Sequence, residues 1–92
     1  MSDNAIQELI INKKQIHLNQ KDKYIKINNR DLDDQNFILI SQITFNHLKQ
    51  IDISKNKIKN IQPLKKMNLS FLEFLNLSYN EIQIIEPVTK IK

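Results

Sequence analysis

Apolar residues in the second half of the chain recur with a period of 24 residues. A shift of 24 positions superimposes Leu48 on Leu72, and nine further pairs follow without a gap. These pairs are Ile51–Leu75, Ile53–Leu77, Ser54–Ser78, Asn56–Asn80, Ile58–Ile82, Ile61–Ile85, Pro63–Pro87, Leu64–Val88 and Met67–Ile91. Ten matching positions in one shift indicate an internal repeat, because a chance motif is much shorter.

Each copy predicts a short strand followed by a sharp turn. Two apolar residues flank one polar residue, Asp52 or Asn76, which is typical of a strand with one buried face. The turn after such a strand leaves buried backbone groups that need hydrogen-bond partners, and a side-chain amide offers both donors and acceptors. We therefore predict that Asn56 and Asn80 are structural residues that bond these turns and link neighbouring copies.

A short helix is expected behind each of these strands. Pro63 and Pro87 occupy positions typical of the first turn of a helix, where a missing N–H costs nothing. Leu64 and Met67 would then bury the inner face of the first of these helices.

A weaker copy precedes these two at residues 24–32. Ile25 and Ile27 take the paired apolar positions, but Arg30 stands where the other copies have Asn, and Ile51 follows Ile25 by 26 residues. Terminal repeats are commonly atypical, so we interpret this copy as the edge of the array. Four apolar residues are expected to fill the return behind its strand: Phe37, Ile40, Ile43 and Phe45.

Residues 1–23 are expected to form an N-terminal cap on the first copy. We predict a helix over residues 2–14 and a strand over residues 16–18 that pairs with residues 24–27. At the other end, the pattern requires another strand after residue 91, and the sequence stops at Lys92. We therefore expect either further sequence or a partner to cover that edge.

Both strong copies fit the pattern L-x-x-L-x-L-x-x-N-x-L, which resembles the leucine-rich repeat family. The variant with Ile after the Asn resembles the intracellular short-repeat class, which includes phosphatase regulators, axonemal dynein light chains and a spliceosomal protein. This resemblance implies an α/β fold: a short leucine-rich repeat solenoid with a parallel concave sheet, and with loops and short helices on the convex side. Residues 24–92 would hold about three repeats, the last one incomplete, in a non-catalytic scaffold or adaptor.

The outward residues of the predicted strands form the candidate partner-binding surface. They are Tyr24, Lys26, Asn28, Gln50, Asp52, Ser54, Phe74, Asn76, Ser78 and Tyr79. Phe74 stands out, because an aromatic side chain on an exposed strand face is typical of a binding anchor, and Tyr24 and Tyr79 are candidates for the same role. The alternative is that they are isolated exposed aromatics, which are common on protein surfaces.

The net charge of +4 is concentrated in one part of the chain. Residues 53–72 carry five lysines and no acidic residue: Lys55, Lys57, Lys59, Lys65 and Lys66. One interpretation is a basic strip that faces RNA or an acidic polymer surface, which makes an RNA-associated subunit the alternative function. The other interpretation is an ordinary solvated face.

Several kinds of chemistry are excluded by composition. The chain has no Gly and no Cys, so it has no Gly-rich phosphate loop, disulfide or thiolate metal site. His17 and His47 have no partner at metal-site or triad spacing, and no nucleophile, base and orienting group come together. Asp31, Asp33 and Asp34 are better explained by a helix start than by a calcium loop. We expect no catalysis, metal, cofactor or small-molecule substrate.

The remaining expectations concern partners and location. No apolar run is long enough to cross a bilayer, and the N-terminus lacks the order of a secretory signal. We therefore predict a cytoplasmic protein without membrane contact, in a cytoskeletal or ciliary setting or, as the alternative, in the nucleus. Its partners would be other proteins in a multi-subunit assembly.

Overall fold

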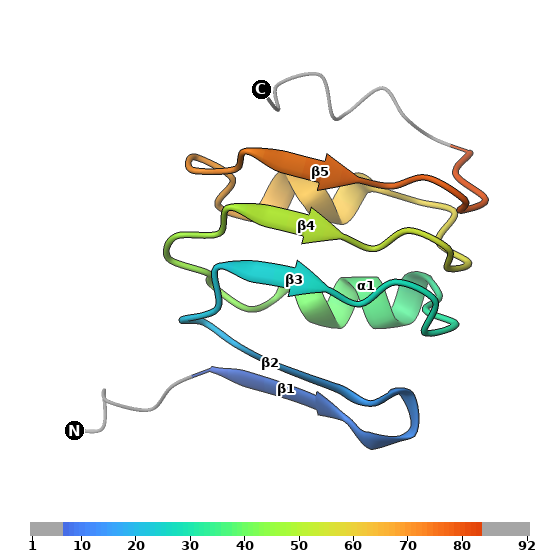
Figure 1. Cartoon of the computed structure of the whole chain (residues 1–92), viewed down its shortest axis with the longest axis horizontal. Coiled ribbons are helices and arrows are strands. Elements are labelled where there is room, and N and C mark those ends of the chain that lie inside the picture. The colour runs from blue at the N-terminus through green and yellow to red at the C-terminus, as the bar shows by residue number, and fades with distance from the viewer. Residues whose placement is uncertain (1–6, 84–92) are drawn as a thin grey trace.

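The computed structural model describes residues 7–83, which form two small sheets and three helical segments. In chain order the elements are β1 (Glu8–Ile11), η1 (Asn12–Lys14), β2 (Ile16–Asn19), β3 (Tyr24–Lys26), α1 (Asp34–Ser41), β4 (Gln50–Asp52), η2 (Gln62–Lys66) and β5 (Phe74–Asn76). Strands β1 and β2 form an antiparallel hairpin, and β3, β4 and β5 form a parallel sheet in that order (Figure 1). No helix within the described part of the chain is long and apolar enough to cross a membrane.

The parallel sheet is in the register predicted by the 24-residue shift for β4 and β5, and by the 26-residue spacing of the weaker copy for β3 and β4. Ile51 of β4 pairs with Leu75 of β5, and Ile25 of β3 pairs with Ile51. Ile25 and Ile51 are fully buried, whereas their polar neighbours on the same strands point to the other face. The alternation of apolar and polar residues therefore gives the sheet one face on the core and one outer face.

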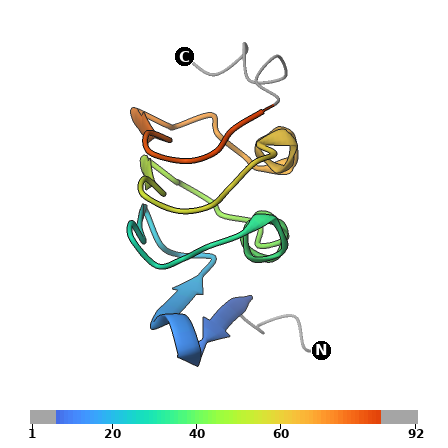
Figure 2. The same ribbon diagram turned by 90° about the vertical axis from the view of Figure 1, so that its right-hand side faces the viewer.

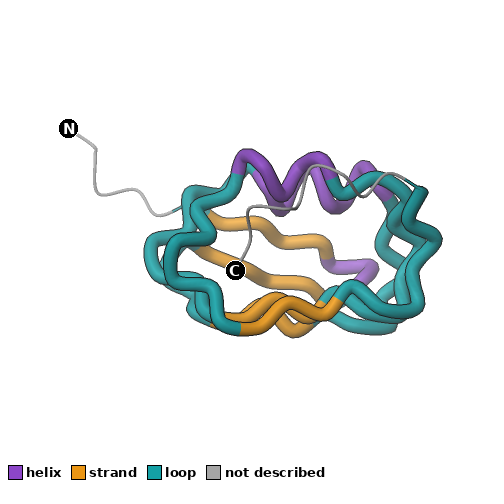
Figure 3. The backbone as a smooth tube through the Cα atoms, turned by 90° about the horizontal axis from the view of Figure 1, so that it is seen from above, coloured by secondary structure: helices purple, strands orange, loops and turns teal. Residues whose placement is uncertain are grey.

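Helical segments lie behind the parallel sheet, on the side opposite its outer face (Figures 2 and 3). Helix α1 begins with a capping box, in which the Asp33 side chain accepts from the backbone N–H of Asn36 and the Asn36 side chain accepts from that of Asp33. This reciprocal cap stabilises the start of a helix of only eight residues. The four apolar residues expected behind β3, Phe37, Ile40, Ile43 and Phe45, are all buried.

The α/β assignment agrees with the structure, but the predicted leucine-rich repeat solenoid, with one concave sheet and recurring convex helices, is wrong. Residues 7–83 form two separate sheets, one of them antiparallel, and their single α-helix is α1. A solenoid repeats one structural unit, and the segments behind these strands differ. The first has the capping box and forms an α-helix, whereas η2 starts without a side-chain cap and forms a 3-10 helix of five residues.

Pro63 lies in the first turn of η2, as predicted, and Leu64 and Met67 are buried behind the sheet. The expected counterparts of these residues in the next copy lie outside the described residues. They are Pro87, Val88 and Ile91, and Ile85, the counterpart of Ile61, lies outside the described residues as well.

The N-terminal segment also differs from its prediction. Residues 8–11 of the helix expected over residues 2–14 form strand β1, and residues 1–6 lie outside the described part. The strand predicted over residues 16–18 exists as β2, but it pairs with β1 and not with residues 24–27. The reversal follows η1, where Gln15 adopts a left-handed conformation with φ 57°. A hairpin joined by so short a connection is antiparallel by necessity.

Candidate functional site

Two aromatic side chains lie in one row across the outer face of the parallel sheet. We use outer face for six outward strand residues: Tyr24, Lys26, Gln50, Asp52, Phe74 and Asn76. Tyr24 pairs in register with Gln50, which pairs with Phe74, so the two rings flank a half-buried glutamine. Tyr24 is 56% exposed and Phe74 is 49% exposed. The row therefore offers a partner two partly exposed rings held on a rigid sheet.

The next row of the outer face is largely bonded within the chain. The Asp52 Oδ1 accepts hydrogen bonds from the backbone N–H and the hydroxyl of Ser54, at 3.1 and 2.7 Å. The Asn76 Oδ1 accepts the equivalent pair from Ser78, at 3.0 and 2.6 Å. Ser54 is also only 5% exposed, so it offers little surface for contact. It instead holds the end of β4 in place.

The other predicted contact residues lie just beyond the strands. Asn28 and Ser78 are exposed, and Tyr79 is 77% exposed. The Lys55 Nζ lies 5.9 Å from the centre of the Tyr79 ring, within the range of a cation–π contact. Tyr79 therefore belongs with the turns that follow the strands and not with the aromatic row.

A surface pocket of about 530 Å³ lies at these turns. We call it the turn pocket. Its lining residues come from four segments that are distant in sequence, and they are Lys13, Lys14, Gln15, Asn29, Arg30, Asp31, Lys55, Asn56, Lys57 and Glu81. Five of these side chains are basic and two are acidic, so the lining has a surplus of three positive charges. Most of the net charge of +4 is therefore gathered at one place in the fold.

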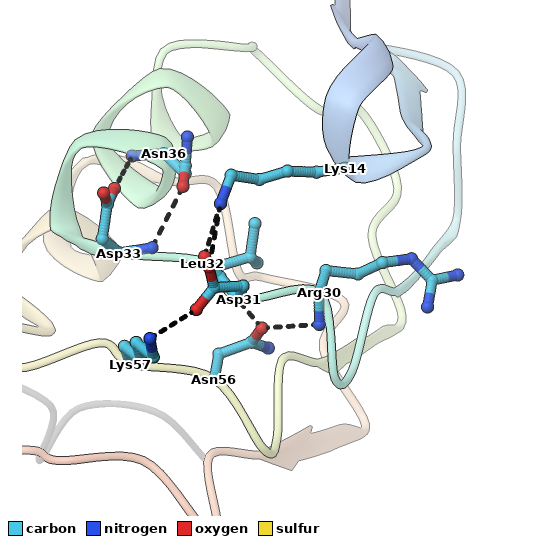
Figure 4. Close-up of polar contacts among 8 residues, drawn as sticks. All are labelled: Lys14, Arg30, Asp31, Leu32, Asp33, Asn36, Asn56 and Lys57. Carbon is cyan, nitrogen blue, oxygen red and sulfur yellow. Dashed lines mark hydrogen bonds and ion pairs between the residues drawn. The ribbon is translucent and has the colours of Figure 1, made fainter.

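An internal carboxylate already occupies part of this positive site (Figure 4). One Asp31 carboxylate oxygen lies 2.9 Å from the Lys57 Nζ, and the other lies 3.9 Å from the Lys14 Nζ. The hydrogen bond and charge of Lys57, together with the charge of Lys14, lower the pKa of Asp31 below its ordinary value. Asp31 in turn raises the pKa of Lys57. Both side chains of the closer pair are 64% exposed, so water screens their attraction.

Arg30 contributes a positive charge that forms no ion pair with this carboxylate. Figure 4 shows its side chain running away from Asp31. Its Nη1 donates to the backbone oxygen of Asn28 at 3.2 Å, while its Nε is buried and has no hydrogen-bond partner among the described residues. Lys13 and Lys55 likewise form no ion pair with any described residue.

Asn56 forms the wall between the turn pocket and the core. Its Oδ1 accepts from the backbone N–H groups of Arg30 and Leu32, both at 2.9 Å (Figure 4). Its Nδ2 donates to three backbone oxygens, those of Ile27, Ile53 and Ser54. Asn80 bonds the next turn in a similar way, accepting from Ile58 and donating to Ile53, Leu77 and Ser78. Both asparagines thus link backbone groups of neighbouring strand ends.

The predicted basic strip is distributed over two parts of the molecule. Lys55 and Lys57 line the turn pocket, whereas Lys65 and Lys66 lie on η2 behind the sheet, and Lys59 lies between them in the chain. The sequence interpretation missed three other basic residues of the pocket, namely Lys13, Lys14 and Arg30. The one sequence feature that pointed to the pocket was Arg30, which stands where the other two copies have Asn.

The acidic cluster and the histidines have structural contacts. Asp33 caps α1, and the Asp34 Oδ1 accepts from the backbone N–H groups of Lys59 and Asn60. His17 lies 3.5 Å from Glu8 in the hairpin, and the His47 ring lies 5.1 Å from that of Phe71. Within residues 7–83, no group of three or more acidic or histidine side chains is arranged to hold a metal ion.

Comparison of the chain with family models, with curated proteins and with solved structures finds no match. The resemblance to the leucine-rich repeat family therefore stays a prediction from the sequence pattern.

Proposed function

We propose that the chain is a non-catalytic protein-binding module whose outer face contacts another protein. The observation that supports this most is the row of Tyr24, Gln50 and Phe74, with both aromatic rings about half exposed. Aromatic residues dominate the binding energy of many protein interfaces, because they bury a large area at little cost in conformational entropy.

The surroundings of the row are consistent with a specific protein contact. Lys26 provides an exposed charge beside the rings, whereas Asp52 and Asn76 are bonded to the serines that follow them. The polar row is therefore ordered before binding, and a partner would pay little entropy to immobilise it. An aromatic anchor with an ordered polar rim is a common arrangement in interfaces.

A photo-crosslinking experiment tests this proposal in cells that contain the natural partner. A benzophenone amino acid replaces Gln50, between the two rings, or Lys65 on η2 as the matched control behind the sheet. We expect Gln50 to give a dominant cross-linked protein that is absent at Lys65. The same band should disappear when Tyr24 and Phe74 are both changed to Ala. Identical products from both positions, or a band that survives the double substitution, would show that the outer face is not the binding surface.

A further inference from the structure

We propose that the turn pocket is a binding site for a phosphate-type oxyanion. The site is defined by the convergence of Lys13, Lys14, Arg30, Lys55 and Lys57 from three separate segments around a pocket of about 530 Å³. Clusters of Arg and Lys recognise phosphate because it carries up to two charges and several strong acceptor oxygens.

The Asp31 carboxylate shows how such an anion is held. It lies 2.9 Å from the ammonium group of Lys57 and 3.9 Å from that of Lys14, in the lining of a site with surplus positive charge. A carboxylate carries one negative charge, so it neutralises only part of the lining. A phosphate group in the pocket competes with this carboxylate for the same two lysines.

Three further donors remain for the ligand. Lys13 and Lys55 form no ion pair with a described residue, and the Arg30 guanidinium forms no ion pair with Asp31. All three residues line the pocket, so an oxyanion there can neutralise positive charge that Asp31 leaves uncompensated. The pocket of about 530 Å³ has room for a pyrophosphate, another small phosphate ester or a phosphorylated side chain, and these are the ligands that we propose.

The test is a titration of the full chain with sodium pyrophosphate, followed by the backbone amide NMR signals at low salt. We expect saturable shifts at residues 13–15, 29–31 and 55–57, which line the pocket. The double variant Arg30→Gln/Lys55→Gln should bind at least about fivefold more weakly. Lys65→Gln/Lys66→Gln, which removes the same charge from η2, should change the affinity less than about twofold.

The Asp31→Asn variant tests the proposal in the opposite direction, because it should bind pyrophosphate more tightly. Unfolding of a variant cannot produce such a gain in affinity. The substitution removes the competing carboxylate and its ion pairs with Lys57 and Lys14, while the Lys14 Nζ still donates to the backbone oxygen of Asp31. Asn also tolerates the left-handed conformation of this residue, at φ 58°. We expect pyrophosphate to bind about threefold or more tightly. Glu73→Gln makes the same change in net charge outside the pocket lining and should have little effect.

A second titration with a phosphoserine peptide distinguishes the two sources of phosphate. Tighter binding of the peptide assigns the site to a phosphorylated protein, and tighter binding of pyrophosphate assigns it to a free phosphate compound. The proposal is overturned if neither probe gives saturable shifts. It is also overturned if the η2 lysine variant loses as much affinity as the pocket variant, or if Asp31→Asn and Glu73→Gln behave alike, since the binding is then unspecific charge attraction.

Discussion

At the scale of single residues, Asn56 makes more connections than any other side chain described above. Its five hydrogen bonds reach the backbone of two segments, residues 27–32 and residues 53–54, and the residue is 7% exposed. Water cannot easily replace these bonds, because the groups concerned are buried or part-buried. The position of Asn56 in the repeat predicted this role, since only a side-chain amide can donate and accept at once.

We predict that Asn56→Ala lowers the free energy of unfolding by about 3 kcal/mol, because it leaves several buried backbone groups unpaired. Asn80→Ala should cost about half as much, since Asn80 is half-buried and its Oδ1 accepts a single bond from the described backbone. Urea unfolding followed by circular dichroism measures both values. Equal losses for the two variants would contradict the importance assigned to burial.

A second residue-scale prediction concerns the pH dependence that Asp31 contributes. Lys57 and Lys14 lower the pKa of Asp31 from its ordinary 3.8, so this stabilisation is present above that value and is lost as the pH falls through the lower pKa of the folded protein. The pKa of Lys57 is raised above its ordinary 10.5, so the stabilisation from this lysine is present below pH 10.5. It is lost as the pH rises through the higher pKa of the folded protein.

Urea midpoints measured from neutral pH down to about pH 2 test the acid limb. The difference in stability between the wild-type protein and Asp31→Asn should shrink as the pH falls below 3.8, because protonation removes the ion pairs that the variant lacks. The effect is small, since the pair is largely exposed. A difference that stays constant over this range would show that the ion pairs contribute nothing.

At the scale of elements, helix α1 depends on its N-terminal cap. It has only eight residues, and isolated helices of that length are unstable in water. Asp33 and Asn36 satisfy backbone donors at its start, while Phe37 and Ile40 bury its inner side. The helix therefore forms through the combination of a cap and tertiary packing.

We predict that Asp33→Ala destabilises the protein by about 1 kcal/mol through loss of the cap. Gln35→Ala is the matched control, since Gln35 is exposed in the same helix and should change stability by less than about 0.5 kcal/mol. Thermal unfolding of the two variants measures the difference. A cost for Gln35→Ala as large as that for Asp33→Ala would show that the loss does not come from the cap, since Ala is a better helix former than Gln.

Sequence reasoning succeeded for elements whose signal is repeated and failed where the signal is local. The positions of Ile51 and Leu75 in the repeat fixed their pairing in β4 and β5. The Glu-Leu-Ile-Ile run at residues 8–11 fits a helix or a strand, and its pairing with β2 decides the outcome. The repeat also could not show that the segments behind the strands differ, because that depends on the cap at Asp33.

At the scale of the whole molecule, the parallel sheet carries one surface on its outer face and a second, with different properties, at the turns that follow its strands. The outer face presents the Tyr24 and Phe74 rings, and the turn pocket gathers positive charge where the strands end. The aromatic residues were visible in the sequence because they stand at outward strand positions. The pocket was not, because its lining comes from four distant segments that only the fold brings together.

The most direct test of the proposed interaction surface is the affinity of the partner identified by cross-linking for two variants, each with one side chain shortened to Ala. Phe74→Ala removes a ring from the outer face, and Leu39→Ala removes a similarly exposed apolar side chain from α1 on the opposite side. We predict that Phe74→Ala weakens binding about tenfold or more, as expected for an anchor residue, and that Leu39→Ala leaves the affinity unchanged. An unchanged affinity for Phe74→Ala, or an equal loss for Leu39→Ala, would contradict the account.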